Sequence, residues 1–138
     1  MKATLICVGR TREPFLEAEA HYLKLLRRHL SLEVVVARDD QDLVARIPGR
    51  AWVVALDEGG RPRSSPEWAK WLEQRRLDGL DLCFLAGGQT GLPAAALAAA
   101  RERVSFGPQT MAHQLARVVL YEQLFRAGKI AAGERYHC

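Results

Sequence analysis

The sequence has few cysteines and no long hydrophobic run, and each of these two features excludes a class of protein. Cys7, Cys83 and Cys138 show no CxxC spacing, so neither a disulfide framework nor a zinc site is expected. Cys7 and Cys83 lie in apolar runs and are predicted to be core thiols. The apolar runs are far shorter than the roughly 20 residues that cross a membrane, and the first nine residues are too short for a signal peptide. These features predict a cytoplasmic protein with no metal and no membrane contact.

The size and charge of the chain set its class. With 138 residues, 49% of them hydrophobic and 26% charged, the chain is expected to form one domain over residues 1–138 with an adequate core. There is no low-complexity tract. A net charge of +4 permits an anionic partner such as RNA without proving one, because many basic proteins bind no nucleic acid.

Strand and helix patterns alternate along the sequence. Strands are predicted at 4–8, 32–36, 51–56, 80–85 and 104–106, and helices at 14–28, 40–47, 65–72, 93–101 and 113–127. A turn is predicted at 57–60, and a cap at Ser65. Such alternation is typical of a single α/β domain with a mostly parallel open sheet and helices on both faces.

Two loops and the tail are the candidate functional segments. A glycine loop at 86–92 follows the strand at 80–85, a polar loop covers 106–113, and the tail is 135–138. Loops after parallel strands line ligand crevices, and glycine lets a backbone approach a ligand. A tight turn explains the glycines equally well. The loop lacks the Gly-Lys-Ser/Thr sequence of phosphate-binding loops.

The last predicted helix is apolar around most of its circumference. A surface helix keeps its apolar residues to one stripe, so this helix is expected to be buried on most sides, with a second copy of the chain as one cover. The alternative is an ordinary core helix with one flank against the sheet. Glu122 and Arg126 lie four residues apart, a spacing that predicts an ion pair.

The ordered motifs of the second half resemble the SPOUT methyltransferases, and among them the small RlmH family that methylates N3 of a pseudouridine in 23S ribosomal RNA. A strand, Gly-Gly-x-x-Gly-Leu, an alanine-rich helix, a short strand and a polar loop are followed by a long helix motif and a closing Tyr-His. The matching positions are Gly87, Gly88, Gly91, Leu92, Thr110, His113, Leu115, Arg117, Val118, Glu122, Leu124, Arg126, Ala127, Tyr136 and His137.

This resemblance implies a fold, a cofactor and partners. The fold would be an open parallel sheet whose C-terminal segment forms a trefoil knot, a rare exception to unknotted topology. S-adenosylmethionine would lie in the knot. The substrate would be ribosomal RNA on assembled ribosomes, and the active site would form at a homodimer interface, with the tail of one subunit near the cofactor of the other. The implied cofactor-binding residues are Leu56, Gly87, Gly88, Phe106, Gly107, Pro108, Gln109, Thr110 and Met111.

Four residues are the catalytic candidates. Methylation of an imide nitrogen requires loss of its proton, which His113 or His137 can accept. Arg117 can stabilise negative charge on the flanking carbonyl oxygens, and Tyr136 can stack on the base. The alternatives without a catalytic role are a structural His113 at a helix start and a frayed terminus at Tyr136 and His137.

Two departures from the family pattern leave rival functions open. Gln89 and Thr90 stand where many members have Pro-Glu, and Cys138 ends the chain where a basic residue is usual. One rival is a non-catalytic RNA- or ribosome-binding assembly factor that keeps the fold. The other is a nucleotide-binding α/β protein, although no lysine follows its glycine loop.

Overall fold

The computed structural model describes residues 1–136 and shows a five-stranded, all-parallel sheet in the order β2-β1-β4-β3-β5. This confirms the predicted α/β class. The strands are β1 (Ala3–Val8), β2 (Leu32–Ala37), β3 (Ala51–Pro62), β4 (Asp81–Ala86) and β5 (Glu102–Ser105). The helices are α1 (Phe15–Leu26), α2 (Asp40–Ala45), α3 (Ser65–Asp78), α4 (Ala94–Ala99) and α5 (His113–Ala131).

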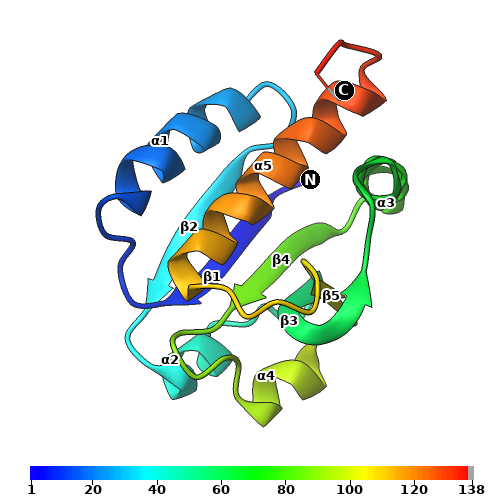
Figure 1. The fold of residues 1–138 in the computed structure, drawn as a ribbon. Helices are drawn as coiled ribbons and strands as arrows, with labels where there is room; N and C mark the ends of the chain where they lie inside the picture. Colours follow the sequence, from blue (N-terminus) through cyan, green and yellow to red (C-terminus); the bar gives the residue numbers. More distant parts are fainter. Residues whose placement is uncertain (137–138) are drawn as a thin grey trace.

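Helices cover both faces of the sheet, as predicted. Helices α1, α5 and α3 pack on one face, and α2 and α4 lie on the other (Figure 1). Successive strand residues point to opposite faces, so in β4 Phe84 joins the first core and Leu85 the second. Burial on both faces explains why the strands are apolar runs without alternation. Within the described residues, no helix is long and apolar enough to cross a membrane.

The cores contain two of the cysteines. Cys7 and Cys83 are fully buried free thiols, which confirms the prediction for both. Burial raises the pKa of Cys83 to about 11 and also raises that of Cys7, so both stay protonated at neutral pH. Cys138 lies outside the described residues.

The predicted turn at 57–60 is wrong, because β3 continues to Pro62. Leu56 and Arg61 both pair with Val104 of β5, so the residues between them form a bulge. At Gly60 a Cβ atom would lie 2.7 Å from the carbonyl carbon of Arg103. The glycine that suggested a turn is therefore required by the close approach of β5.

Helix α5 lies between α1 and α3, which cover its two flanks (Figure 1). Within one chain these two helices cover part of its apolar circumference, and a second copy of the chain as a further cover stays a prediction. The predicted pair is confirmed, with Arg126 Nη2 2.7 Å from Glu122 Oε1. One large apolar side chain near the start of the helix, Leu115, remains 40% exposed.

Helix α3 begins with a complete capping box. The cap is Ser64, one residue before the predicted Ser65: its Oγ accepts from the Glu67 amide, and the Glu67 carboxylate accepts from the Ser64 amide. Two backbone donors that the helix leaves unpaired are thereby satisfied. The helix consequently starts at a defined residue directly after the long strand β3.

Candidate functional site

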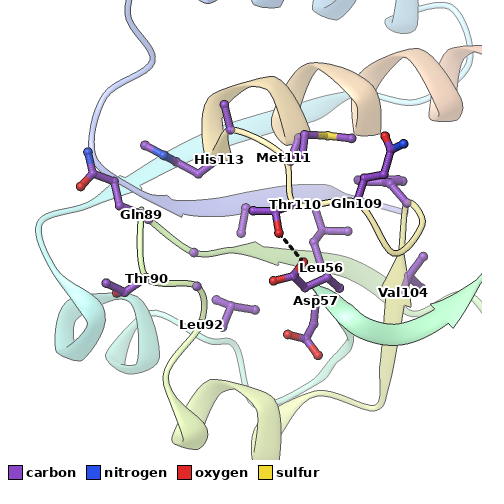
Figure 2. A pocket seen from close by; sticks show the side chains of 18 of the residues that line it. Leu56, Asp57, Gln89, Thr90, Leu92, Val104, Gln109, Thr110, Met111 and His113 are labelled. Atoms are coloured by element: carbon purple, nitrogen blue, oxygen red, sulfur yellow. Dashed lines mark hydrogen bonds between the residues drawn. The ribbon is translucent and has the colours of Figure 1, made fainter.

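A cavity of about 520 Å³ lies at the carboxyl ends of β3, β4 and β5, the position where parallel sheets bind ligands. Its walls are the bulge of β3, the glycine loop, the polar loop and the first turn of α5 (Figure 2). The lining residues are Leu56, Asp57, Glu58, Ala86, Gly87, Gly88, Gln89, Thr90, Gly91, Leu92, Val104, Phe106, Gly107, Gln109, Thr110, Met111, Ala112, His113 and Ala116.

The glycine loop is a tight turn that also forms a wall of the cavity. The Gly91 amide donates to the Gly88 carbonyl at 3.1 Å, and Gly91 has a φ of +80°, which favours glycine. A Cβ atom on Gly87 would lie 2.3 Å from the carbonyl carbon of Gly91. These glycines can therefore both form a tight turn and approach a ligand, because the turn itself places the loop backbone at the cavity.

The polar loop is held at both of its ends. The Ser105 hydroxyl donates to the Gly107 carbonyl at 2.9 Å and accepts from the Gly107 amide at 3.0 Å. Farther along, the Thr110 hydroxyl donates to the Glu58 carboxylate at 3.4 Å, the dashed line of Figure 2. The loop thus reaches the cavity with its backbone and one hydroxyl already positioned.

The charge of the cavity is opposite to that of the chain. The β3 bulge brings the carboxylates of Asp57 and Glu58 to the cavity, and no lysine or arginine is among its lining residues. The whole chain carries +4. A cavity with acidic side chains and no fixed cation favours a cationic ligand and disfavours a phosphate.

His113 is the titratable base of the cavity. It is the first residue of α5 and one of the residues that line the cavity, on the side of Gln89 in Figure 2. Burial, and after it the positive charge of Arg117, lowers its pKa below the usual value. His113 is therefore neutral at neutral pH and able to accept a proton.

Arg117 does not line the cavity, although the motif marked it as a catalytic candidate. Its side chain is fully buried, and its guanidinium donates to the Val8 carbonyl at 2.7 Å and to the Gly9 carbonyl and the Thr11 hydroxyl at 3.0 Å each. The same hydroxyl donates to Glu19, which also accepts from a tyrosine of α5. The structure thus places Arg117 where it joins α5 to the end of β1, one turn beyond His113.

Tyr136 lies at the other end of α5. Its ring packs edge-on against Phe125, with centroids 4.9 Å apart, and the Arg126 guanidinium lies 4.6 Å from its ring centre. From His113 to Phe125 the helix rises about 18 Å, at about 1.5 Å per residue. Tyr136 therefore does not reach the cavity of its own chain. His137 lies outside the described residues.

The structure brings most of the predicted cofactor residues together. All of them except Pro108 line the cavity, and His113 joins them. The acidic pair Asp57 and Glu58 was missed, because the predicted turn concealed a bulge that faces a ligand. Its signal in the sequence was a pair of carboxylates placed directly after a buried strand. No group of three metal-ligating side chains occurs between residues 1 and 136.

Comparison with known proteins identifies the family. Residues 1–137 match the family described as "Predicted SPOUT methyltransferase". Two proteins named "Ribosomal RNA large subunit methyltransferase H" are similar over almost their full length. The one from Gemmatimonas aurantiaca is 39% identical over 99% of both chains, and the one from Solidesulfovibrio magneticus is 43% identical over 96% of both.

Solved structures share the fold at low sequence identity. A probable methylase family protein from Haemophilus influenzae superposes with a TM-score of 0.64 at 9% identity, over 99% of this chain and 70% of the other. The SpoU methyltransferase AviRb from Streptomyces viridochromogenes, solved with AdoMet, gives a TM-score of 0.56 at 13% identity, over 97% and 59%. With its parallel sheet, its cavity at the strand ends and the match over residues 1–137, the chain belongs to the SPOUT methyltransferase family.

Proposed function

We propose that this chain, acting as one domain in the cytoplasm, transfers a methyl group from S-adenosylmethionine to N3 of a pseudouridine in 23S ribosomal RNA on assembled ribosomes. Full-length relatives named as large-subunit ribosomal RNA methyltransferases support this proposal. The observation that carries it is the cavity at the strand ends, which has two carboxylates and no lysine or arginine. We also expect the trefoil knot of the SPOUT fold at the C-terminal segment.

The residues of the cavity fit this cofactor. Asp57 and Glu58 complement the positive charges of a sulfonium and an ammonium group. Leu56 and Met111 can pack against the adenine ring, and backbone groups of the glycine and polar loops can bond its edge. A nucleotide polyphosphate fits poorly, because its charge would meet the two carboxylates with no cation to offset it.

His113 is the proposed base. When bound, S-adenosylmethionine supplies a methyl group attached to a sulfonium ion. The imide nitrogen of the base must lose its proton to become the nucleophile, and His113 is neutral, lines the cavity and can accept that proton. Arg117 is proposed to position His113 by joining α5 to β1 rather than to contact the base.

The active site is proposed to be completed by a second copy of the chain. Tyr136 lies too far along α5 to reach its own cavity, so its stacking role requires the cavity of a partner. The partially exposed Leu115 lies next to Ala116, which lines the cavity, and offers apolar surface for that contact. In the proposed homodimer, Tyr136 and His137 of one copy act at the cavity of the other.

Transfer of labelled methyl to ribosomes lacking the modification tests the proposal. We expect transfer by the full chain and none by a chain ending at Arg135. No transfer by either, together with no cofactor binding, would contradict the enzyme proposal and favour the ribosome-binding assembly factor.

Calorimetry tests the role of the acidic pair. Asp57→Asn and Glu58→Gln should lower affinity for S-adenosylmethionine several-fold more than affinity for S-adenosylhomocysteine, because only the former carries the sulfonium charge. Glu17→Gln, which removes an exposed carboxylate of α1, is the control. Equal losses for both ligands would contradict the charge-matching role.

A further inference from the structure

A second cavity, of about 340 Å³, lies at the opposite end of the sheet. It opens where β1 and β2 begin, between the C-terminal ends of α1 and α3. Three arginines line it: Arg27 and Arg28 after α1, and Arg76 in the last turn of α3. No carboxylate is among its lining residues, so its charge is opposite to that of the first cavity.

The arginines are largely available to a ligand. Within residues 1–136, Arg27 and Arg28 are exposed and form no side-chain hydrogen bond or ion pair. Arg76 is fixed in place, because its guanidinium donates to the carbonyl of His29. Its nearest carboxylate, that of Glu73, is 3.8 Å away and 58% exposed, and an exposed pair of this kind is weak.

Helix dipoles account for only part of this arrangement. Cations are favoured at helix C-termini by about 0.3–1 kcal/mol each, which explains an arginine at the end of α1 and another at the end of α3. The helix-dipole effect does not explain why these arginines line the same cavity. The ring of His29 packs against Phe125 and Gly128 of α5. The His29 carbonyl accepts from Arg76 and so holds that guanidinium at the cavity.

The second cavity lies close to the C-terminal tail. The rings of His29 and Tyr136 both contact Phe125, at centroid distances of 5.8 and 4.9 Å. Glu134, the nearby acid on the tail, is paired with Lys129, and the charges of Arg28 and His29 contribute to lowering its pKa. A surface that meets Tyr136 would therefore also meet the arginines.

We propose that this second cavity binds a backbone phosphate of the ribosomal RNA substrate. The inference rests on the proposed function, in which Tyr136 of one copy acts at the cofactor cavity of the other. The arginines beside that tail would then hold the RNA strand next to the target base. Guanidinium groups suit this role, because their donors pair with two phosphate oxygens at once.

Ribosome binding at several salt concentrations tests the proposal. The probe is the ribosome lacking the modification, and the variant is Arg27→Gln with Arg28→Gln. We expect binding to weaken about tenfold or more, the size of one lost charge-assisted hydrogen bond, and the salt slope to fall by about two. The KM for ribosomes should rise with little change in kcat, and S-adenosylmethionine affinity should stay as in the wild type.

A matched variant removes the same charge elsewhere. Arg50→Gln with Lys70→Gln changes two exposed cations outside the cavity and should leave ribosome binding within about twofold, since dispersed surface charge is screened. Equal losses in both double variants, or no loss in the first, would overturn the proposal. A loss on whole ribosomes but not on protein-free 23S RNA would also overturn it, by assigning the cavity to a ribosomal protein. Because binding is measured without methyl transfer, failure of the proposed enzyme activity is distinguishable from failure of this site.

Discussion

Arg117 illustrates, at the residue scale, how a position in a functional motif can act from outside the cavity. It is fully buried and gives its donors to the backbone at the end of β1 and to Thr11. Thr11 and Tyr121 both donate to Glu19, so one polar network connects β1, α1 and α5. Such a network is strong when complete and costly when a member is removed.

Arg117→Gln should therefore lower the free energy of unfolding by about 3 kcal/mol, because buried acceptors lose their donor. Urea unfolding measures this loss. The acid limb of the methyl-transfer pH profile, where His113 gains a proton, should also move to higher pH, since the nearby positive charge lowers the pKa of His113 in the wild type.

The control is Arg46→Gln, which breaks an exposed ion pair with Asp42 and should cost at most about 1 kcal/mol. Wild-type stability of Arg117→Gln together with abolished transfer would instead indicate direct contact with the substrate.

Gly87 is a second residue whose surroundings explain its identity, because they leave no room for a side chain. Gly87→Ala would place a Cβ 2.3 Å from the Gly91 backbone, so the glycine loop must move. We expect at least a tenfold loss of S-adenosylmethionine affinity by calorimetry, because the loop is a wall of the cavity. Gly49→Ala, where a Cβ meets nothing within 4 Å, should bind like the wild type. Equal affinities in the two variants would show that the loop does not touch the cofactor.

At the element scale, Glu102 joins β5 to β3 and α3. Its carboxylate accepts from Trp52 Nε1 at 2.6 Å, from Trp71 Nε1 at 3.0 Å and from the Arg63 guanidinium. The Arg63 guanidinium also lies 4.6 Å from the ring centre of Trp68, which stacks on Phe106 of the polar loop. A wall of the first cavity is thus supported by this cluster.

The pH dependence of stability should report this cluster. Burial alone would raise the pKa of Glu102, but hydrogen bonds from Trp71, Arg63 and Trp52 outweigh it and lower the pKa. The stabilisation is therefore present above the unfolded-state pKa near 4.5 and is lost as pH falls through the lower folded-state value. Glu102→Gln should be less stable than the wild type at pH 7, and the difference should shrink below pH 4 in urea titrations. Exposed Glu17→Gln should follow the wild-type curve, and a Glu102→Gln deficit that persists unchanged in acid would contradict the assignment.

At the scale of the whole molecule, the two cavities lie at opposite ends of one parallel sheet and differ in charge. All strands run the same way, so the loops that follow the strands gather at one end of the sheet. The C-terminal ends of α1 and α3 lie at the other end. A single copy therefore separates its proposed cofactor cavity from its tail and arginines. In the proposed homodimer, the tail and arginines of one copy lie beside the cofactor cavity of its partner.

Complementation tests this arrangement. A chain ending at Arg135 keeps its cofactor cavity, and a full-length Gly87→Ala chain keeps its tail. At a cofactor concentration that leaves Gly87→Ala unsaturated, mixing the two should give more methyl transfer than the sum of the separate chains, since a mixed dimer contains one intact composite site. Gly87→Ala mixed with wild type serves as the control for subunit exchange. Active monomers in sedimentation, or no gain over that sum despite exchange, would contradict a shared site.

Much of the fold could be predicted from the sequence. Apolar runs, capping residues and helical periodicity located the five strands and five helices of the described residues, because these signals act locally. Most bounds agree within four residues, but β3 and α3 each continue six residues beyond their predicted ends. The glycine and polar loops marked the cavity, since parallel strands deliver such loops to one end of the sheet. These features follow from the order of residues along the chain.

Other features were decided only by tertiary structure. Gly60 stays in β3 because the backbone of β5 passes beside it, and the resulting bulge brings Asp57 and Glu58 to the cavity. Burial of Arg117 depends on backbone acceptors more than 100 residues away, and the second cavity forms where Arg27 and Arg76 meet. Local patterns specify helices and strands, whereas the charge and composition of a cavity depend on which distant segments the packed sheet places side by side.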